Sequence, residues 1–145
     1  MDSVIHIAVM VEPYLDKVCT GAKYIESRLT KVNMAPYGHA RPGDVVLFKR
    51  SGGPIVAAAT IDRVLYREAA GLGDLVDITD EFKDGLGYEQ GYVEAKALAR
   101  FVSLMWLGNI RPVASVALAK QSRQAWLTVR PHPEPPSKQW AFSVL

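Results

Sequence analysis

The sequence predicts an α+β fold that is mainly β, with short strands forming a small mixed barrel flanked by two or three helices. Two observations give this prediction. Segments of strand length recur along the 145 residues between turn residues, and three other segments show helical spacing. The length is typical of one domain with enough residues to bury a core, so we expect a single domain over residues 1–145.

The expected strands differ in how they are recognised. Residues 5–11 are apolar throughout, which is typical of a buried strand, and residues 24–30 alternate between apolar and polar side chains. Residues 44–50 and 54–65 flank Ser51-Gly52-Gly53, which indicates a hairpin. Further strands are expected over 101–107, 112–119, 125–129 and 140–145, with a turn at Gly108-Asn109 and an extended proline-rich connection over 130–136.

Three helices are expected: residues 12–20, a helix near 72–83, and one from about 88 to 100. In the first of them, Leu15, Val18 and Cys19 have the spacing of a core-facing stripe. We therefore expect Cys19 to be a small core residue rather than a nucleophile. Gly21 stands where a left-handed C-cap is expected.

Composition excludes several classes of protein. With 49% hydrophobic and 22% charged residues, the chain is globular rather than disordered. A net charge of +2 neither requires nor excludes nucleic acid. The single cysteine rules out an intramolecular disulfide and suits a reducing compartment. Since no segment has the length of a membrane span and the N-terminus lacks the basic residues of a signal peptide, we expect a cytoplasmic protein without a membrane partner.

The three histidines do not predict a metal centre. His6 lies near the start of the first strand, and His39 and His132 lie in separate loops. None of them has a carboxylate or a cysteine at a ligand-like spacing. We therefore expect no metal and no cofactor, and we expect His6 to be a packed or hydrogen-bonded structural residue.

One charge-rich stretch stands out between two apolar segments, and it contains Gly21, Lys23, Glu26 and Arg28. The alternation of the strand places Glu26 and Arg28 on one face, and Lys23 enters from the glycine turn. Opposite charges that converge on one sheet face can bind or react with a ligand. The alternative is a solvated ion pair worth under about 1 kcal/mol.

These four residues spell G-x-K-x-x-E-x-R, and downstream a Pro-Gly-Asp turn at residues 42–44 leads into a strand. With both features the chain resembles the ASCH domain, a relative of the PUA RNA-binding fold. The resemblance runs through the whole chain and is strongest over residues 6–64. It implies a PUA-like barrel.

The resemblance also implies a function. Some small bacterial ASCH proteins hydrolyse N4-acetylcytidine to cytidine and acetate, with the motif lysine, a threonine three residues on and a more distant glutamate. Lys23 matches the lysine, whereas Glu26 occupies the threonine position. The chain thus resembles an N4-acylcytidine amidohydrolase in which Lys23 and Glu26 would position a water molecule. Lys23 would act as a base or, if the charge of Glu26 keeps it protonated, would polarise the scissile carbonyl or stabilise the oxyanion. Glu89, or alternatively Glu81, is the candidate for the distant catalytic acid.

Four further residues are expected to bind substrate. Arg28 shares the motif face, whereas the Ser27 hydroxyl is expected on the opposite face. Tyr37, in the loop over residues 30–42, could stack on a base or pack on its own loop. Lys49 ends a strand and either adds positive charge near the site or is solvated. A basic-aromatic group follows residue 119 and consists of Lys120, Arg123 and Trp126, of which Trp126 is expected in the core.

Two other functions remain open from the sequence. One is an RNA-binding or ribonucleolytic module, in which Lys23 and Arg28 would stabilise a phosphorane; the scattered basic residues argue against it. The other is a non-catalytic reader of a modified nucleoside. The expected partner is a modified cytidine nucleoside, with RNA as the second choice. The sequence does not predict the preferred acyl group or the oligomeric state.

Overall fold

The structure is a computed structural model that describes residues 3–116, 124–130 and 132. The strands and helices along the described chain are, in order, β1 (Ile5–Met10), α1 (Tyr14–Thr20), β2 (Ile25–Thr30), β3 (Val45–Arg50), β4 (Ile55–Glu68), α2 (Leu72–Glu81), α3 (Lys83–Leu86), α4 (Tyr92–Ala95), β5 (Phe101–Val116) and β6 (Trp126–Thr128).

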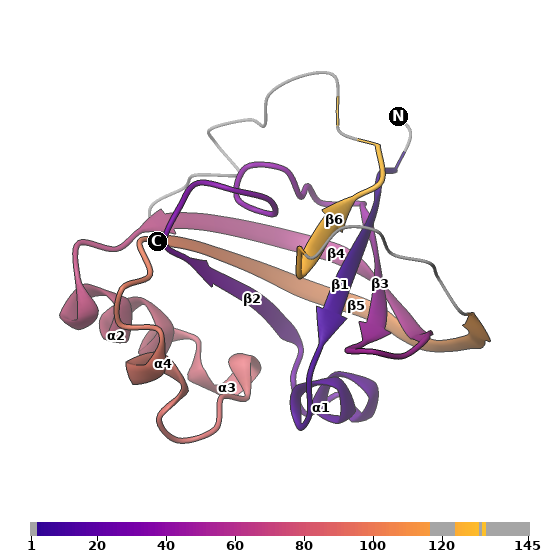
Figure 1. Cartoon of the computed structure of the whole chain (residues 1–145), viewed down its shortest axis with the longest axis horizontal. Helices are drawn as coiled ribbons and strands as arrows, with labels where there is room; N and C mark the ends of the chain where they lie inside the picture. The colour runs from indigo at the N-terminus through magenta and orange to yellow at the C-terminus, as the bar shows by residue number, and fades with distance from the viewer. Residues whose placement is uncertain (1–2, 117–123, 131, 133–145) are drawn as a thin grey trace.

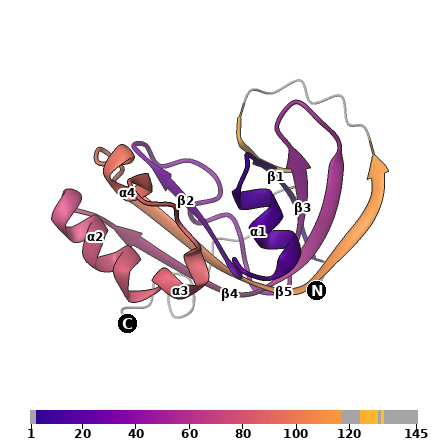
Figure 2. The same ribbon diagram turned by 90° about the horizontal axis from the view of Figure 1, so that it is seen from below.

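The six strands form one sheet in the order β2-β5-β4-β3-β1-β6. β1 and β3 run parallel, and the other neighbouring pairs run antiparallel. The sheet curls into a half-barrel (Figure 1), and Figure 2 shows that α1 lies within its curve. The curl brings β1 opposite the edge strand β2. The two strands are close enough that the Arg28 side chain of β2 donates a hydrogen bond to the Val9 carbonyl of β1.

Apolar side chains cover both faces of the sheet. On the inner face, Leu15 and Val18 of α1 pack against a cluster that includes Phe48 and Met105. On the other face, residues of α2 and α3 such as Leu75 and Leu86 pack with Ile25, Leu29, Leu65, Val102 and Leu104. β2 contributes Ile25 and Leu29 to this second cluster, as the alternation predicts. Its polar side chains Glu26 and Arg28 therefore face the inside of the curl.

The confirmed predictions are those with strong local signals. β1, β2 and β3 lie within a residue or two of their expected bounds, and β4 continues to Glu68. Gly21 ends α1 in the left-handed conformation, with its N–H donating to Val18 O. In the Pro-Gly-Asp turn, the Asp44 carboxylate accepts hydrogen bonds from the backbone N–H groups of Val4 and Arg41. That turn thus ties the starts of β1 and β3 together.

The turn expected at Gly108-Asn109 is wrong. β5 runs without a turn from Phe101 to Val116 and pairs with β4. The register between β4 and β5 shifts beside these residues, and Asn109 has a φ of 49°. A β-bulge can place a residue in the left-handed backbone conformation that a tight turn also uses, which is why the two signals look alike in a sequence.

The helix expected from about residue 88 to 100 is also wrong in extent, because only Tyr92–Ala95 is helical. Gly91 has a φ of 86° and precedes this short helix, so a right-handed helix cannot run through it. The helix expected near 72–83 is present as α2 and is followed directly by the four-residue α3.

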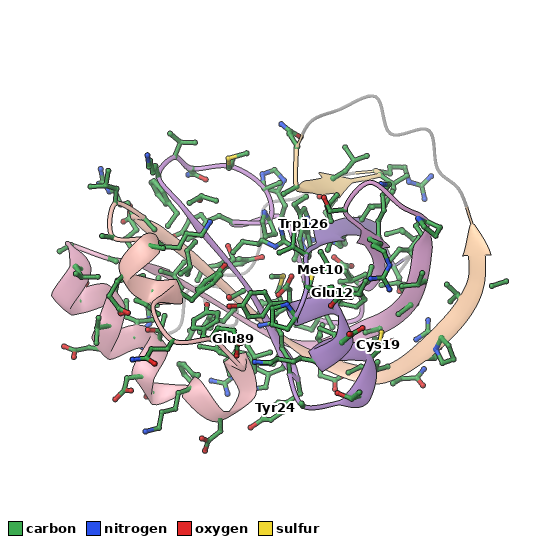
Figure 3. The ribbon with its side chains drawn as sticks, turned by 60° about the horizontal axis from the view of Figure 1, so that its bottom comes forward. Met10, Glu12, Cys19, Tyr24, Glu89 and Trp126 are labelled. Carbon is green, nitrogen blue, oxygen red and sulfur yellow. The ribbon has the colours of Figure 1, made fainter. Side chains whose placement is uncertain are left out.

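Cys19 is exposed rather than a core residue, and Figure 3 shows it on α1. The core contacts of α1 come from Leu15 and Val18. At about 100° per residue, Cys19 points about 70° away from the direction midway between those two side chains. It therefore lies at the margin of the apolar face of this short helix.

Several expectations fall outside the described residues: the strand over 140–145, nearly all of the proline-rich connection, the end of the strand over 112–119, and the basic residues Lys120 and Arg123. Trp126 is described and is buried in the inner core, as expected. Within the described part of the chain, none of the helices has the length and apolar character needed to cross a membrane.

Candidate active site

The end of α1 fixes the backbone that carries Lys23. After the Gly21 cap, the Lys23 N–H donates to Lys17 O at 2.9 Å, and the Tyr24 N–H donates to Gly85 O at 3.0 Å. Gly87 lies against this segment, since a Cβ there would be 3.3 Å from the Lys23 Cβ. The turn is thus held between α1 and α3, and it directs Lys23 inward just before β2 begins.

The Lys23 side chain is almost completely buried, with 2% of its surface exposed. Its Nζ donates a hydrogen bond to Leu86 O at 2.6 Å and lies 3.6 Å from Glu26 Oε1. The ring centroids of Tyr88 and Tyr14 lie 5.3 Å and 5.8 Å from Nζ. The ammonium group therefore has a carboxylate, a carbonyl and two aromatic faces as neighbours in place of bulk water.

Glu26 is held on its other side by Arg28. Glu26 Oε2 lies 2.7 Å from Arg28 Nη2, and Glu26 Oε1 accepts the Ser27 N–H at 3.0 Å. Nη2 of Arg28 also donates to Val9 O at 3.1 Å. The three charged motif residues therefore form one row, Lys23–Glu26–Arg28, in place of the solvated ion pair that was the alternative.

The pKa of Lys23 and the pKa of Glu26 both lie below their ordinary values. Burial lowers the pKa of Lys23 below its ordinary value; the charge of Glu26 opposes this, and the charge of Arg28 adds to it. Burial works to raise the pKa of Glu26, but the charges of Arg28 and Lys23 and the hydrogen bonds from Arg28 and Ser27 outweigh it and hold this pKa below its usual range. Glu26 is therefore a carboxylate at neutral pH. Lys23 loses its proton at a lower pH than a solvated lysine does.

These residues line a cavity of about 420 Å³, here called the Lys23 cavity. Its walls come from the end of β1, the start of α1, the motif on β2, the segment after α3, and the residue before β6. The residues used below are Met10, Tyr14, Lys23, Glu26, Ser27, Arg28, Tyr88, Tyr92, Lys96 and Ala125. A volume of this size lies within the range of about 300–1,000 Å³ that is typical of small-molecule sites.

Ser27 reaches the Lys23 cavity from the opposite face of β2. Its hydroxyl is hydrogen-bonded to the hydroxyl of Tyr88, which is stacked on the ring of Tyr92 with centroids 4.4 Å apart. Burial raises the pKa of Tyr88 far above its ordinary value, so its hydroxyl keeps its proton. Strand parity is therefore as expected, and the cavity extends around the free edge of β2.

Four residues considered for the site lie elsewhere. The Glu89 side chain is 59% exposed and pairs with Lys17 at 2.8 Å, and Glu81 is exposed at the end of α2. Tyr37 packs against Tyr66 and Phe101, with ring centroids 5.1 Å away in both cases. Lys49 donates to Arg50 O. None of the four lines the Lys23 cavity, so their placement does not support the expected catalytic and binding roles.

The sequence did not predict the aromatic lining of the cavity. Tyr14, Tyr88 and Tyr92 come from segments expected to be helical, and the Leu86 carbonyl that receives Lys23 lies in α3. The only available signal was the clustering of tyrosines near residue 90, and the spacing of Tyr88 and Tyr92 is equally typical of a helix face.

The half-barrel and its flanking helices give the chain the fold of solved ASCH proteins, as the family resemblance implied. Solved structures with this fold include the ASCH protein from Zymomonas mobilis and two single-residue variants of it. Each is 9% identical to this chain and matches 87% of it, with TM-scores of 0.69, 0.69 and 0.68. The match covers 87%, 90% and 88% of those chains. At this identity the likeness shows the fold alone.

Sequence comparison adds nothing to this assignment. No protein-family profile matches the chain, and no curated protein matches it.

Proposed function

We propose that the chain is an amidohydrolase that cleaves the N4-acyl amide of modified cytidine, releasing cytidine and a carboxylic acid. The observation that carries the proposal is Lys23. This lysine is buried in a cavity of small-molecule size, its pKa is lowered, and its only carboxylate neighbour in the motif is already paired with Arg28. A lysine in such a setting is suited to act as a base, since its neutral form is populated nearer to working pH.

The contacts of Lys23 are compatible with a neutral amine. A neutral amine has two N–H groups and one lone pair. The hydrogen bond to Leu86 O takes up one N–H group, and Glu26 Oε1 lies 3.6 Å from Nζ, beyond hydrogen-bond distance, so the lone pair is left to accept a proton. After protonation, the third N–H completes an ammonium ion that the Glu26 carboxylate stabilises.

The proposed reaction has two proton transfers. Lys23 takes a proton from water as the water oxygen bonds to the acyl carbon, which gives a tetrahedral intermediate. Lys23 then returns that proton to N4 as the bond between carbon and N4 breaks, so the products are the amine of cytidine and the acid. Glu26 orients Lys23, and Arg28 keeps Glu26 ionised. General acid–base assistance of this kind is worth about 10²–10⁴ in rate.

The aromatic walls suit a nucleoside. Tyr14, Tyr88 and Tyr92 offer ring faces and edges on which a pyrimidine can pack, and Arg28 and Ser27 offer donors for its polar edge. Incubation with N4-acetylcytidine and chromatography of the products test the proposal. Release of cytidine and acetate supports it. Binding without release would overturn it in favour of a non-catalytic reader.

A second candidate, RNA binding or cleavage, is favoured by one observation. A hollow of about 270 Å³ shares Leu29 and Lys96 with the Lys23 cavity, and a third hollow continues along residues 97–99 to Arg100. Lys31, Lys96 and Arg100 line this track. Binding through several phosphates weakens steeply with salt, whereas turnover of a neutral nucleoside does not. A salt titration of both activities therefore separates the two functions.

A further inference from the structure

The strand β6, at the opposite end of the sheet from β2, holds Arg28 in place. Nη1 of Arg28 donates to Ala125 O at 3.4 Å, and the guanidinium carbon of Arg28 lies 5.4 Å from the centroid of the Trp126 ring. Trp126 belongs to β6, which shares no ladder with β2. Figure 3 shows Trp126 beside Met10, whose sulfur also contacts Arg28. The start of β6 and Met10 therefore form the binding surface for the Arg28 guanidinium, here called the Arg28 seat.

A buried polar chain fixes Trp126 in turn. Its indole Nε1–H donates to His6 Nδ1 at 3.3 Å, and His6 Nε2 lies 2.7 Å from Asp44 Oδ2. Because an indole N–H can only donate, Nδ1 must accept, and the proton of neutral His6 is then on Nε2 and is donated to Asp44. The Thr128 hydroxyl lies 2.9 Å from the same Nδ1. Trp126, His6 and Asp44 are all buried.

We infer that Trp126, His6 and Asp44 position Arg28 over the Lys23 cavity and thereby fix the Glu26 carboxylate beside Lys23. None of these three residues is catalytic, since each acts through its neighbour. The kinetic consequence rests on the proposed function, whereas the effect on Lys23 itself does not. The sequence places these residues far from the motif, and only the curl of the sheet brings the chain of contacts to Arg28.

The inference predicts a change in the electrostatics of Lys23. The charged and titratable groups that face its side chain or the cavity are Glu26, Arg28, Lys17, Lys96, Tyr14, Tyr88 and Tyr92. If the contacts of the Arg28 seat weaken and Arg28 moves away from Glu26, Lys23 loses a neighbouring positive charge. Glu26 also loses its closest partner and becomes free to turn toward Lys23. Both changes favour the ammonium form.

Trp126→Phe tests this directly, because it keeps an aromatic ring and removes only the N–H donor and part of the indole. The titration of the Lys23 ¹³Cε resonance, measured by NMR, should move to higher pH by roughly half a unit or more, a fraction of the one to three units that a close charge can produce. The acid limb of the pH–rate profile should move in the same direction. A role in folding alone would lower the melting temperature and leave both profiles in place.

Trp106→Phe is the matched control, since Trp106 packs against Arg63, whose guanidinium carbon lies 4.2 Å from its ring, and neither residue lines the cavity. It should leave the Lys23 titration unchanged. If Trp126→Phe does not fold, the pair His6→Gln and His6→Leu decides, because Gln retains an acceptor for the indole N–H and Leu does not. Only His6→Leu should shift the titration of the Lys23 ¹³Cε resonance.

An unchanged Lys23 titration in folded Trp126→Phe or folded His6→Leu overturns the inference. The NMR titration needs no turnover, so the two proposals fail separately. If the parent protein hydrolyses no acylcytidine but its Lys23 titration still shifts in Trp126→Phe, the positioning role stands and the proposed function falls.

Discussion

The Nζ atom of Lys23 lies 3.6 Å from Oε1 of Glu26, and both side chains are at least 96% buried. A buried pair of this kind is costly to desolvate and is weak evidence for a stabilising role. It is stronger evidence for a functional one, because Arg28 satisfies Glu26 from the other side, and burial lowers the pKa of Lys23 at the wall of a cavity.

Lys23→Met should lower turnover strongly without unfolding the protein. Methionine fills a similar volume, and Glu26 keeps its partner Arg28, so no buried carboxylate is left without a partner. We expect kcat to fall by about 10² or more, with a change in Tm of no more than about 4 °C, which corresponds to roughly 1 kcal/mol in a domain of this size. Calorimetry and product chromatography give the two values. Near-normal turnover in the folded variant would remove Lys23 from the mechanism.

Glu26→Gln should lower the pKa of Lys23 further, because it removes the carboxylate that opposes the effect of burial. The acid limb of the pH–rate profile should then move to lower pH, opposite to the shift expected for Trp126→Phe. The amide still accepts a hydrogen bond, so the loss of rate should be smaller than for Lys23→Met, about tenfold. A limb that moves upward would contradict the account.

Asp44→Asn tests the pH dependence of stability. Burial works to raise the pKa of Asp44, but hydrogen bonds from His6, His132 and two backbone N–H groups hold it below its ordinary value of 3.8. A lowered carboxyl pKa contributes stability that is present above the ordinary pKa and is lost as the pH falls through the folded-state pKa. Asp44→Asn should therefore cost about 2–4 kcal/mol of unfolding free energy at pH 7.

That cost should shrink as the pH falls below 3.8 toward the folded-state pKa of Asp44. Urea unfolding at pH 7 and at a series of acid pH values measures the difference. Asp77→Asn, on the exposed face of α2, is the matched control and should change little at either pH. An Asp44→Asn cost that is the same at every pH would show that ionisation of Asp44 is unimportant.

Glu89→Gln should leave catalysis nearly intact. Its carboxylate is exposed and pairs with Lys17 rather than Lys23, and an ion pair of this type is worth about 0–1 kcal/mol. We expect less than a twofold change in kcat/KM and a small change in Tm. A loss of a hundredfold would restore Glu89 as the distant catalytic acid that the family resemblance implied.

The motif could be predicted from sequence because its geometry is local. The glycine cap, the turn and the period of two along β2 are enough to place Lys23, Glu26 and Arg28 together. The same alternation puts Ile25 and Leu29 on the opposite face of β2, where both enter the core. The long pairing of β4 with β5 was partly missed, because the Gly108-Asn109 pair serves a bulge as well as a turn.

The rest of the site depends on contacts between distant segments. The Leu86 carbonyl, the Tyr88 ring and the start of β6 reach Lys23 and Arg28 only through the curl of the sheet and the packing of α3. No spacing in the sequence encodes such approaches. The place of Glu89 at an expected helix start and of Tyr37 in a long loop did not predict which side chains line the cavity. Tertiary packing decides which side chains reach the Lys23 cavity.

The most direct test of the account is to measure the pKa of Lys23 and the pH–rate profile on the same protein. The ¹³Cε titration, assigned by its loss in Lys23→Met, gives the pKa, and cytidine release from N4-acetylcytidine gives the profile. We predict a Lys23 pKa below the ordinary 10.5 and an acid limb that coincides with it, because the neutral amine is the base. A Lys23 that titrates at or above 10.5, or a rate that does not follow its titration, would contradict the central claim.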